Sequence, residues 1–147
     1  MSITFMWEGA GYRNVFGYFL YDSATQSVKA NPGYVTIFQD ATWLGTDDPP
    51  GCMETGTTVN VSRQFKAGDV VGFWIIADGY PNPDNKYTWK SIHNTTNVNN
   101  ADNKRHTVWA QLADFNNIVL IGFEDLYDLG DQDYNDGKNL ILFELLF

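Results

Sequence analysis

Short runs of apolar and β-branched residues, separated by turn-forming residues, recur along the whole chain. The runs are rich in Val, Ile, Phe, Tyr and Trp, and Gly, Pro, Asn or Asp bounds each of them, which is typical of β-strands. No stretch keeps the period of an amphipathic α-helix, so no helix is expected. The predicted strands are 3–8, 15–22, 34–40, 57–62, 70–78, 106–112, 117–125 and 139–147.

Two of the runs, 70–77 and 140–147, are apolar at nearly every position. Such strands are covered on both faces or lie centrally in a sandwich. We therefore predict an all-β protein, an antiparallel β-sandwich of two packed sheets with long loops, as one domain over 1–147. Two connections, 40–56 and 78–103, are longer than a sandwich needs for closure, and loops of that length often carry function.

The composition narrows the classes of partner and compartment. The net charge is −9, so a nucleic-acid partner is not expected, because the phosphate backbone demands a basic face. No apolar run reaches the roughly 18 residues of a membrane span, so membrane insertion is not expected either. The N-terminus lacks the pattern of a signal peptide. We therefore expect a cytoplasmic chain, one exported without an N-terminal signal, or a domain of a larger chain.

Cys52 is the only cysteine, so neither an internal disulfide nor a cysteine zinc cluster is expected.

The most unusual segment is 124–136, which holds six carboxylates and no Lys or Arg. Two carboxylates about 5 Å apart repel each other by roughly 3 kcal/mol at an effective dielectric of 20. Several such pairs would be serious for a domain whose total stability is about 5–15 kcal/mol. A divalent cation would remove the repulsion.

Calcium fits this segment best, because it takes six to eight oxygen ligands from carboxylates, amides and carbonyls. Asp131, Asp133 and Asn135 have the spacing of the first three ligands of an EF-hand loop, although Asp136 stands where that loop has Gly. Magnesium keeps more of its waters, and zinc prefers His or Cys. The alternative is a solvated turn, which explains two or three acids but not six. The predicted ligands are Glu124, Asp125, Asp131, Asp133, Asn135 and Asp136, with Asp128 the weakest candidate.

The closing run "GFEDLYDLGDQDYNDGKNLILFEL" resembles the signature of the calcium-dependent ligand-binding domain of giant bacterial repeats-in-toxin adhesins. "WEGAGYRNVFGYFLYD", "FKAGDVVGFWIIADG" and "KRHTVWAQL" are also similar to that family, so the resemblance spans nearly the whole chain. The chain departs from the signature at Tyr127 and Asp128, where Pro or Gly is common.

The resemblance implies a β-sandwich that binds several calcium ions and takes part in cell adhesion. Members of that family bind the free C-terminal end of partner peptides through calcium. Giant adhesins leave the cell by type I secretion, which uses no N-terminal signal, so a secreted or cell-surface location is implied. By the same resemblance, the chain would be a monomeric module of a larger adhesin, and the acidic positions of the motif are the six predicted ligands.

A second candidate site lies in the loop "ADGYPNPDNKYTW", which combines acids with aromatic residues. It would be a further calcium or ligand loop, or else a packed loop closed by its own aromatic side chains. Arg13 and Asn14 could orient a ligand, although Arg13 more often pairs with a surface acid. The predicted ligand-binding residues are Asp78, Tyr80, Asp84 and Trp89.

Three functions remain open from the sequence. The first is a calcium-dependent recognition module for the C-terminal carboxylate of a peptide or protein. The second is a lectin-like module for cell-surface glycans, with calcium on vicinal hydroxyls and aromatic rings on the sugar face. The third is a structural, calcium-stabilised spacer. We do not expect an enzyme, because no nucleophile motif or phosphate loop is present and His93 and His106 show no metal spacing.

Overall fold

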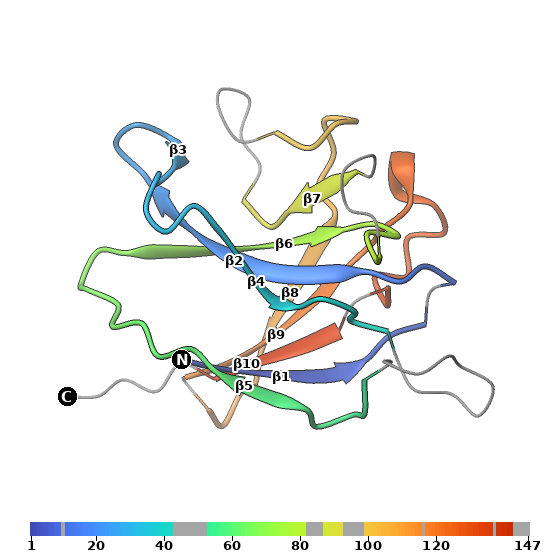
Figure 1. Ribbon diagram of the computed structural model, residues 1–147, viewed down its shortest axis with the longest axis horizontal. Coiled ribbons are helices and arrows are strands. Elements are labelled where there is room, and N and C mark those ends of the chain that lie inside the picture. The colour runs from blue at the N-terminus through green and yellow to red at the C-terminus, as the bar shows by residue number, and fades with distance from the viewer. Residues whose placement is uncertain are drawn as a thin grey trace.

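The computed structural model describes residues 1–9, 11–42, 53–81, 87–92, 99–115, 117–136 and 138–142. These residues form β-strands and one short 3₁₀ turn, with no α-helix among them (Figure 1). Accordingly, no described helix is long and apolar enough to cross a membrane. The elements are β1 (Ser2–Trp7), β2 (Val15–Asp22), β3 (Ser27–Val28), β4 (Tyr34–Phe38), β5 (Thr58–Asn60), β6 (Val70–Ile76), β7 (Thr88–Lys90), β8 (Thr107–Gln111), β9 (Ile118–Phe123), η2 (Tyr127–Leu129) and β10 (Lys138–Leu142).

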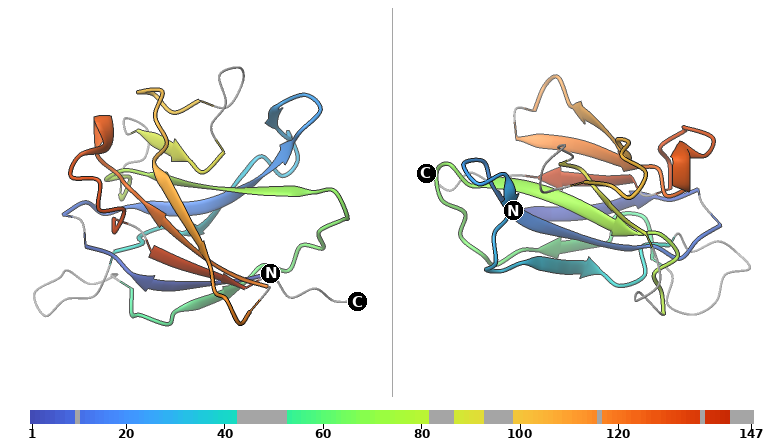
Figure 2. Two further views of the ribbon diagram at one scale, coloured as in Figure 1. Left: turned by 180° about the vertical axis from the view of Figure 1, so that it is seen from behind. Right: turned by 90° about the horizontal axis from the view of Figure 1, so that it is seen from above.

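The strands form two antiparallel sheets. The first sheet has the order β5-β1-β10-β9-β8, and the second has the order β3-β2-β6-β7 with β4 paired to β2. The sheets lie one over the other when the molecule is seen from several sides (Figures 1 and 2). The predicted antiparallel β-sandwich is therefore confirmed.

The core between the sheets is built from alternate residues of facing strands. Ile3 and Phe5 of β1 and Ile121 and Phe123 of β9 are fully buried from the first sheet. The second sheet contributes buried aromatic rings, among which Phe16 stacks on its neighbours at centroid distances of 5.9 and 6.0 Å. Each fully buried side chain of this kind stabilises the fold by about 1.5–3 kcal/mol. The aromatic rings that the second sheet contributes to this core are Phe16, Tyr18, Phe38 and Phe73.

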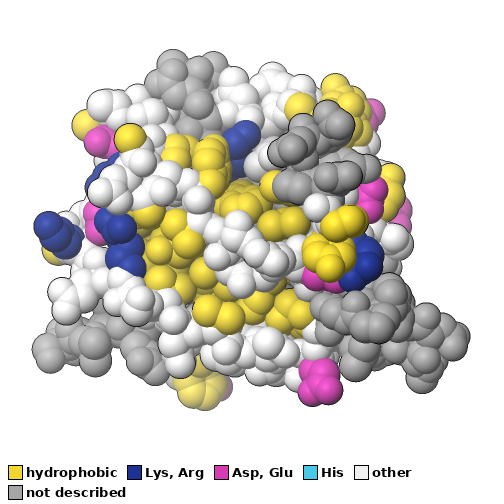
Figure 3. All heavy atoms as spheres, in the orientation of Figure 1, with side chains coloured by type: hydrophobic (Ala, Val, Ile, Leu, Met, Phe, Trp, Pro, Cys, Tyr) yellow, Lys and Arg dark blue, Asp and Glu magenta, His cyan; other side chains and the backbone are white. Residues whose placement is uncertain are grey.

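A second, smaller cluster lies outside this main core, around Val15, Phe19 and Trp74. The ring of Tyr34 contacts both Phe19 and Trp74, although Tyr34 itself remains half exposed. In the view of Figure 3, hydrophobic side chains gather over the middle of the molecule, and charged side chains lie mostly toward its margins. The central strands β2 and β6 therefore have apolar side chains on both faces, as their continuous apolar sequences predicted.

All eight predicted strands exist, and two short strands were missed. β6 lies between β2 and β7, and β10 lies between β1 and β9, so both continuous apolar runs are central strands as predicted. The missed strands are β3, two residues long, and β7, which interrupts the predicted loop 78–103. Residues 143–147 of the last predicted strand, and 43–52 of the loop 40–56, lie outside the described residues.

Close backbone contacts fix the acidic segment 124–136 against the ends of β1 and β9. The N–H of Asp136 donates to the carbonyl of Phe123 at 3.1 Å, and the N–H of Gly9 donates to the carbonyl of Asn135 at 3.1 Å. A Cβ at Gly122 would lie 2.6 Å from the carbonyl oxygen of Tyr134, so only glycine allows the segment to approach β9 this closely. The acids are therefore held at one end of the sandwich.

Candidate metal centre

The segment 124–136 divides its carboxylates between the interior and the surface. Glu124, Asp125 and Asp136 expose 0%, 2% and 7% of their surface, whereas Asp131 and Asp133 are exposed. Acidic side chains are almost never fully buried unless they are paired. Three buried acids within thirteen positions therefore require a partner.

The predicted acidic ligands come together in two overlapping groups. Glu124, Asp125 and Asp136 offer oxygen atoms that all lie within 4.8 Å of one another, and so do Glu124, Asp131 and Asp133. Oxygens that share a calcium ion at about 2.3–2.6 Å lie at most about 5 Å apart, so both groups match the size of a calcium shell. Glu124 belongs to both groups and is the centre of the site.

Glu124 has the most revealing environment. Its Oε1 accepts a long hydrogen bond of 3.4 Å from the N–H of Leu126. Its Oε2 is buried, and no hydrogen-bond partner for it is found among the residues that the structure describes. A buried carboxylate oxygen without a donor is strongly unfavourable, and a cation would satisfy it. The all-oxygen donor set and this unpaired oxygen fit calcium, and Glu124, Asp125, Asp131, Asp133 and Asp136 are the side chains that would hold it.

The buried acids are electrostatically strained. Burial, followed by the charge of Asp136, raises the pKa of Glu124 to about 7. Burial raises the pKa of Asp125 to about 7 as well, against the lowering effect of a hydrogen bond from Asn14, and the charges of Asp136 and Glu124 add to the rise. Burial also raises the pKa of Asp136. The centre therefore holds protons near neutral pH unless a cation replaces them.

Asn14 fastens the buried half of the segment to the rest of the sandwich. Its Nδ2 donates to Asp125 Oδ2 at 2.7 Å and to the carbonyl of Asp136 at 2.9 Å, and its Oδ1 accepts from the N–H of Asp78 at 2.9 Å. Asn14 is itself fully buried. The sequence suggested that Asn14 orients a ligand, but here it orients the acids.

Trp89 also helps to hold the buried acids in place. Its Nε1 donates to the carbonyl of Asp125 at 2.6 Å, and its ring stacks on His106 with a centroid distance of 3.7 Å and an interplanar angle of 1°. Trp89 has no exposed surface, so direct contact with a ligand, as predicted from the sequence, is not available to it. Its ring belongs to the hydrophobic core and positions the backbone of Asp125.

His106 and Asp102 connect the centre to the preceding loop. His106 Nδ1 lies 2.8 Å from the carbonyl oxygen of Glu124, and Nε2 lies 2.8 Å from Asp102 Oδ2. Both ring nitrogens of the buried His106 therefore have a polar partner. Burial acts to raise the pKa of Asp102, but hydrogen bonds from His106 and from two backbone N–H groups lower it. His106 is thus a structural residue just before β8.

Asp128 points away from the centre. Its carboxylate pairs with Lys104, and its N–H donates to Asp102 Oδ2 at 2.9 Å. Asp128 therefore closes the loop, in agreement with its place as the weakest predicted ligand. Asn135 donates from its backbone N–H to Asp133 Oδ1 at 3.0 Å and from its amide to Asp133 Oδ2. This contact orders Asp133 beside the centre.

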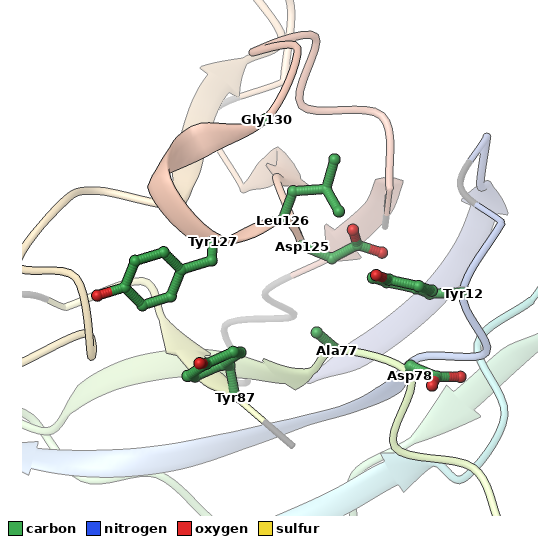
Figure 4. A pocket seen from close by; sticks show the side chains of 8 residues that line it. All are labelled: Tyr12, Ala77, Asp78, Tyr87, Asp125, Leu126, Tyr127 and Gly130. Carbon is green, nitrogen blue, oxygen red and sulfur yellow. The ribbon is translucent and has the colours of Figure 1, made fainter.

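A pocket of about 450 Å³ opens directly beside the buried acids (Figure 4). Asp125, Leu126 and Gly130 form one side of it, and Ala77 and Asp78 follow from the end of β6. Three partly exposed tyrosines, Tyr12, Tyr87 and Tyr127, surround the opening, with Tyr87 and Tyr127 in ring contact at 5.1 Å. The pocket combines carboxylates with aromatic walls.

The predicted ligand-binding residues are not brought together. Asp78 lines the pocket and has a left-handed backbone with φ of 49°. Tyr80 lies elsewhere, in a second cavity of about 280 Å³ that it shares with Trp74, and Arg13 covers its ring at 4.3 Å. Arg13 also pairs with Asp40. Asp84 lies outside the described residues.

Sequence reasoning missed Glu8 and Tyr12, and it assigned no ligand contact to Tyr127. Glu8 is 4% exposed, and its charge contributes to the raised pKa of Asp125. Tyr87 lay in the aromatic loop that we considered, and Tyr127 at a departure from the family signature. The only sequence signal for Glu8 was its place in the "WEGAGYRN" run.

The part of the chain that contains this segment matches a known family whose function is not established. A family model described as "Domain of unknown function (DUF4114)" matches residues 65–138, half of the chain. The match runs from before β6 through the acidic segment to the start of β10. No protein of curated function and no solved structure matches the chain.

Proposed function

The chain belongs to the family described as domain of unknown function DUF4114, and from that premise we propose that it is a calcium-dependent recognition module. Its ligand is the free C-terminal carboxylate of a peptide or protein. The module acts in adhesion, as part of a secreted or cell-surface protein, and binds without catalysing a reaction.

The single observation that carries the proposal is the unpaired Oε2 of Glu124. This oxygen is buried, and Glu124 belongs to two overlapping groups of acids that each offer oxygen atoms within 4.8 Å of one another. Hydrogen bonds from Asn14 and Trp89 hold Asp125 and Asp136 in place, so the acids cannot relax outward individually. A centre that keeps its charges buried and one oxygen without a donor is arranged for a cation.

The pocket beside the centre supports recognition. Its described lining contains Asp78 and Asp125 and no Lys or Arg. A bare carboxylate ligand would be repelled there, and bound calcium supplies the local positive charge that such a ligand requires. The rings of Tyr12, Tyr87 and Tyr127 offer apolar area at little entropic cost, as aromatic side chains do at many interfaces.

A lectin-like function is the second candidate, because partly exposed tyrosine rings beside an oxygen-rich centre also suit a sugar. Sugar hydroxyls would replace the carboxylate, and the ring faces would pack on the sugar. A purely structural spacer would need the centre but not the pocket.

The test compares a peptide ending in a free carboxylate with its amidated twin, in millimolar calcium and in chelator. We expect the carboxylate peptide to bind more tightly by about tenfold or more, as expected for a charged group received by a cation, and only with calcium. Asp78→Ala and Tyr12→Ala should weaken binding, whereas Asp114→Ala, an exposed acid outside the pocket lining, serves as the matched control. Equal binding of the two peptides would exclude the carboxylate mechanism, and glycan binding that requires calcium would favour the lectin.

A further inference from the structure

The free edge of the first sheet differs from the other sheet edges. β5, at the opposite edge, and β7, at an edge of the second sheet, have three residues each, and β3 has two. β8 has five, "TVWAQ", without charge or proline. Proteins usually protect edges by keeping them short or by placing Lys or Pro on them. β4 is as long as β8, but its side chains are partly buried, whereas four of the five in β8 are exposed.

Large apolar side chains are exposed along β8 and just beyond it. Val108 is 44% exposed and Trp109 is 47% exposed, and Leu112 and Phe115 follow at 39% and 52%. The right-hand view of Figure 2 shows β8 at the margin of the molecule, with its partner strand β9 beside it. The opposite edge of the same sheet is polar, because Ser2 and Thr4 bond to Asn60 and Thr58. Of the two edges of the first sheet, the β8 edge therefore carries the exposed large apolar side chains.

The hydrogen-bond pattern tells which backbone groups of β8 face outward. The N–H of Glu124 donates to the carbonyl of His106, and the N–H of Leu112 donates to the carbonyl of Ile118. In an antiparallel ladder such bonds alternate, so the even-numbered residues of this segment point their backbone groups toward β9. The backbone N–H and C=O of Thr107 and Trp109 therefore point away from the sheet, where another strand can pair with them.

Charge placement identifies the partner. Arg105 precedes β8, and Asp114 stands in the turn that follows it, and both are exposed. Two copies of β8 placed antiparallel bring Arg105 of each copy toward Asp114 of the other, whereas a parallel arrangement opposes like charges. With a two-fold axis at Trp109, the middle residue of β8, the end of the strand that Arg105 precedes lies beside the end of the other copy that Asp114 follows.

We propose that β8 is a homophilic docking edge, at which a second copy of this chain pairs antiparallel to form a continuous sheet across the two molecules. Symmetric, self-complementary contacts of this kind are the commonest route to homodimers. The pairing buries Val108 and Trp109 and supplies hydrogen-bond partners for the outward backbone groups of Thr107 and Trp109. It revises the expectation of a monomeric module, and it does not depend on the calcium centre.

The first test is sedimentation equilibrium of the purified chain in calcium over a range of concentrations. We expect a reversible monomer–dimer equilibrium. Val108→Lys places two lysines close together across the axis, and it should raise the dimer dissociation constant by about tenfold or more. Thr58→Lys, an equivalent change at the β5 edge, should leave the constant unchanged. A chain that stays monomeric at all concentrations overturns the proposal.

The second test exchanges the charges and needs no change in the strand itself. Arg105→Glu and Asp114→Arg should each weaken self-association by about tenfold, because each opposes like charges twice in the dimer. Mixing the two single variants restores both attractive pairs, so the mixture should form heterodimers as readily as the unchanged chain. If mixing restores nothing, or if neither variant changes the association of the unchanged chain, the antiparallel β8 pairing is wrong.

Discussion

The two halves of the acidic segment differ, although one short stretch of sequence supplies both. Glu124, Asp125 and Asp136 are buried and fastened by side chains from other elements, notably Asn14 and Trp89. Asp131 and Asp133 are exposed, and Asp133 accepts hydrogen bonds from the backbone and the side-chain amide of Asn135 beside it. The buried half is therefore built by the fold, whereas the exposed half is built by its own turn.

This difference shows how a sandwich can hold a charged centre. Buried carboxylates are tolerated when rigid donors bond some of their oxygens and a cation satisfies the others. The exposed acids then complete the shell from the solvent side, where their own desolvation is small. Removal of a buried support should affect folding, whereas removal of an exposed acid should affect the affinity for calcium alone.

The largest expected effect comes from Trp89→Ala, which removes the support of the buried half. A buried Trp replaced by Ala typically costs 3–5 kcal/mol, because it leaves a cavity. Here the carbonyl of Asp125 and the ring of His106 also lose their partner. Thermal unfolding in calcium should show this loss, and Tyr127→Ala, an exposed ring of the same aromatic group, should cost less than about 1 kcal/mol. If the two variants lost similar amounts of stability, the proposed difference between the buried and the exposed half of the segment would be wrong.

Glu124→Gln should stabilise the domain in the absence of calcium and destabilise it in the presence of calcium. In chelator the variant removes a buried charge and its repulsion with Asp136, so the melting temperature should rise. In calcium at a hundredfold excess over the dissociation constant, the unchanged domain gains about 2.7 kcal/mol, and the variant should lose most of this gain. Scanning calorimetry in both buffers measures the two shifts. A variant that is destabilised equally in both would show that Glu124 is merely structural.

The pH dependence without calcium follows from the raised pKa values. Glu124 and Asp125 titrate near 7 in the folded state and near their ordinary values when unfolded. The folded state therefore binds more protons between about pH 4.5 and 7, and its stability falls as the pH rises through that window. In chelator the domain should melt at a higher temperature at pH 5 than at pH 8. A melting temperature that rises with pH would contradict this assignment.

The smallest effect on stability is expected for Asp133→Asn in the exposed half. In chelator it should change the free energy of unfolding by less than about 0.5 kcal/mol, as surface substitutions usually do. Its calcium affinity should nevertheless fall by about tenfold or more, because an anionic ligand is lost. Asp128→Asn is the matched control, since Asp128 pairs with Lys104 instead. Equal affinities for the two variants would remove Asp133 from the centre.

Most of the fold could be predicted from the sequence, because strand signals are local. Alternating and continuous apolar runs located all eight predicted strands, including the central positions of β6 and β10. β3 and β7 escaped, because two or three residues carry too little pattern, and β7 exists through its pairing with β6. The sharing of β2 among three partners is a long-range property that no local pattern contains.

The candidate site could be predicted only where its residues are neighbours in the sequence. The charge of the segment 124–136 indicated a candidate site from the sequence alone. Glu8, Asn14 and Trp89 reach the same centre from segments distant in the sequence, so their roles depend on the packing of the two sheets. Trp89 was expected to contact a ligand, because an aromatic residue in a loop gives no sign of whether the fold will bury it.

The most direct test of the account is a calorimetric titration of calcium into the chelator-treated domain at neutral pH, with the unchanged chain and Glu124→Gln side by side. The account predicts that calcium binding to the unchanged chain is saturable and releases protons. Glu124 and Asp125 have pKa values of about 7, so they are partly protonated at neutral pH until calcium displaces the protons. It predicts that binding to Glu124→Gln is weaker by about a hundredfold, because the shared ligand of both acid groups is lost. An unchanged chain that binds no calcium, or a variant that binds it equally well, would contradict the central claim.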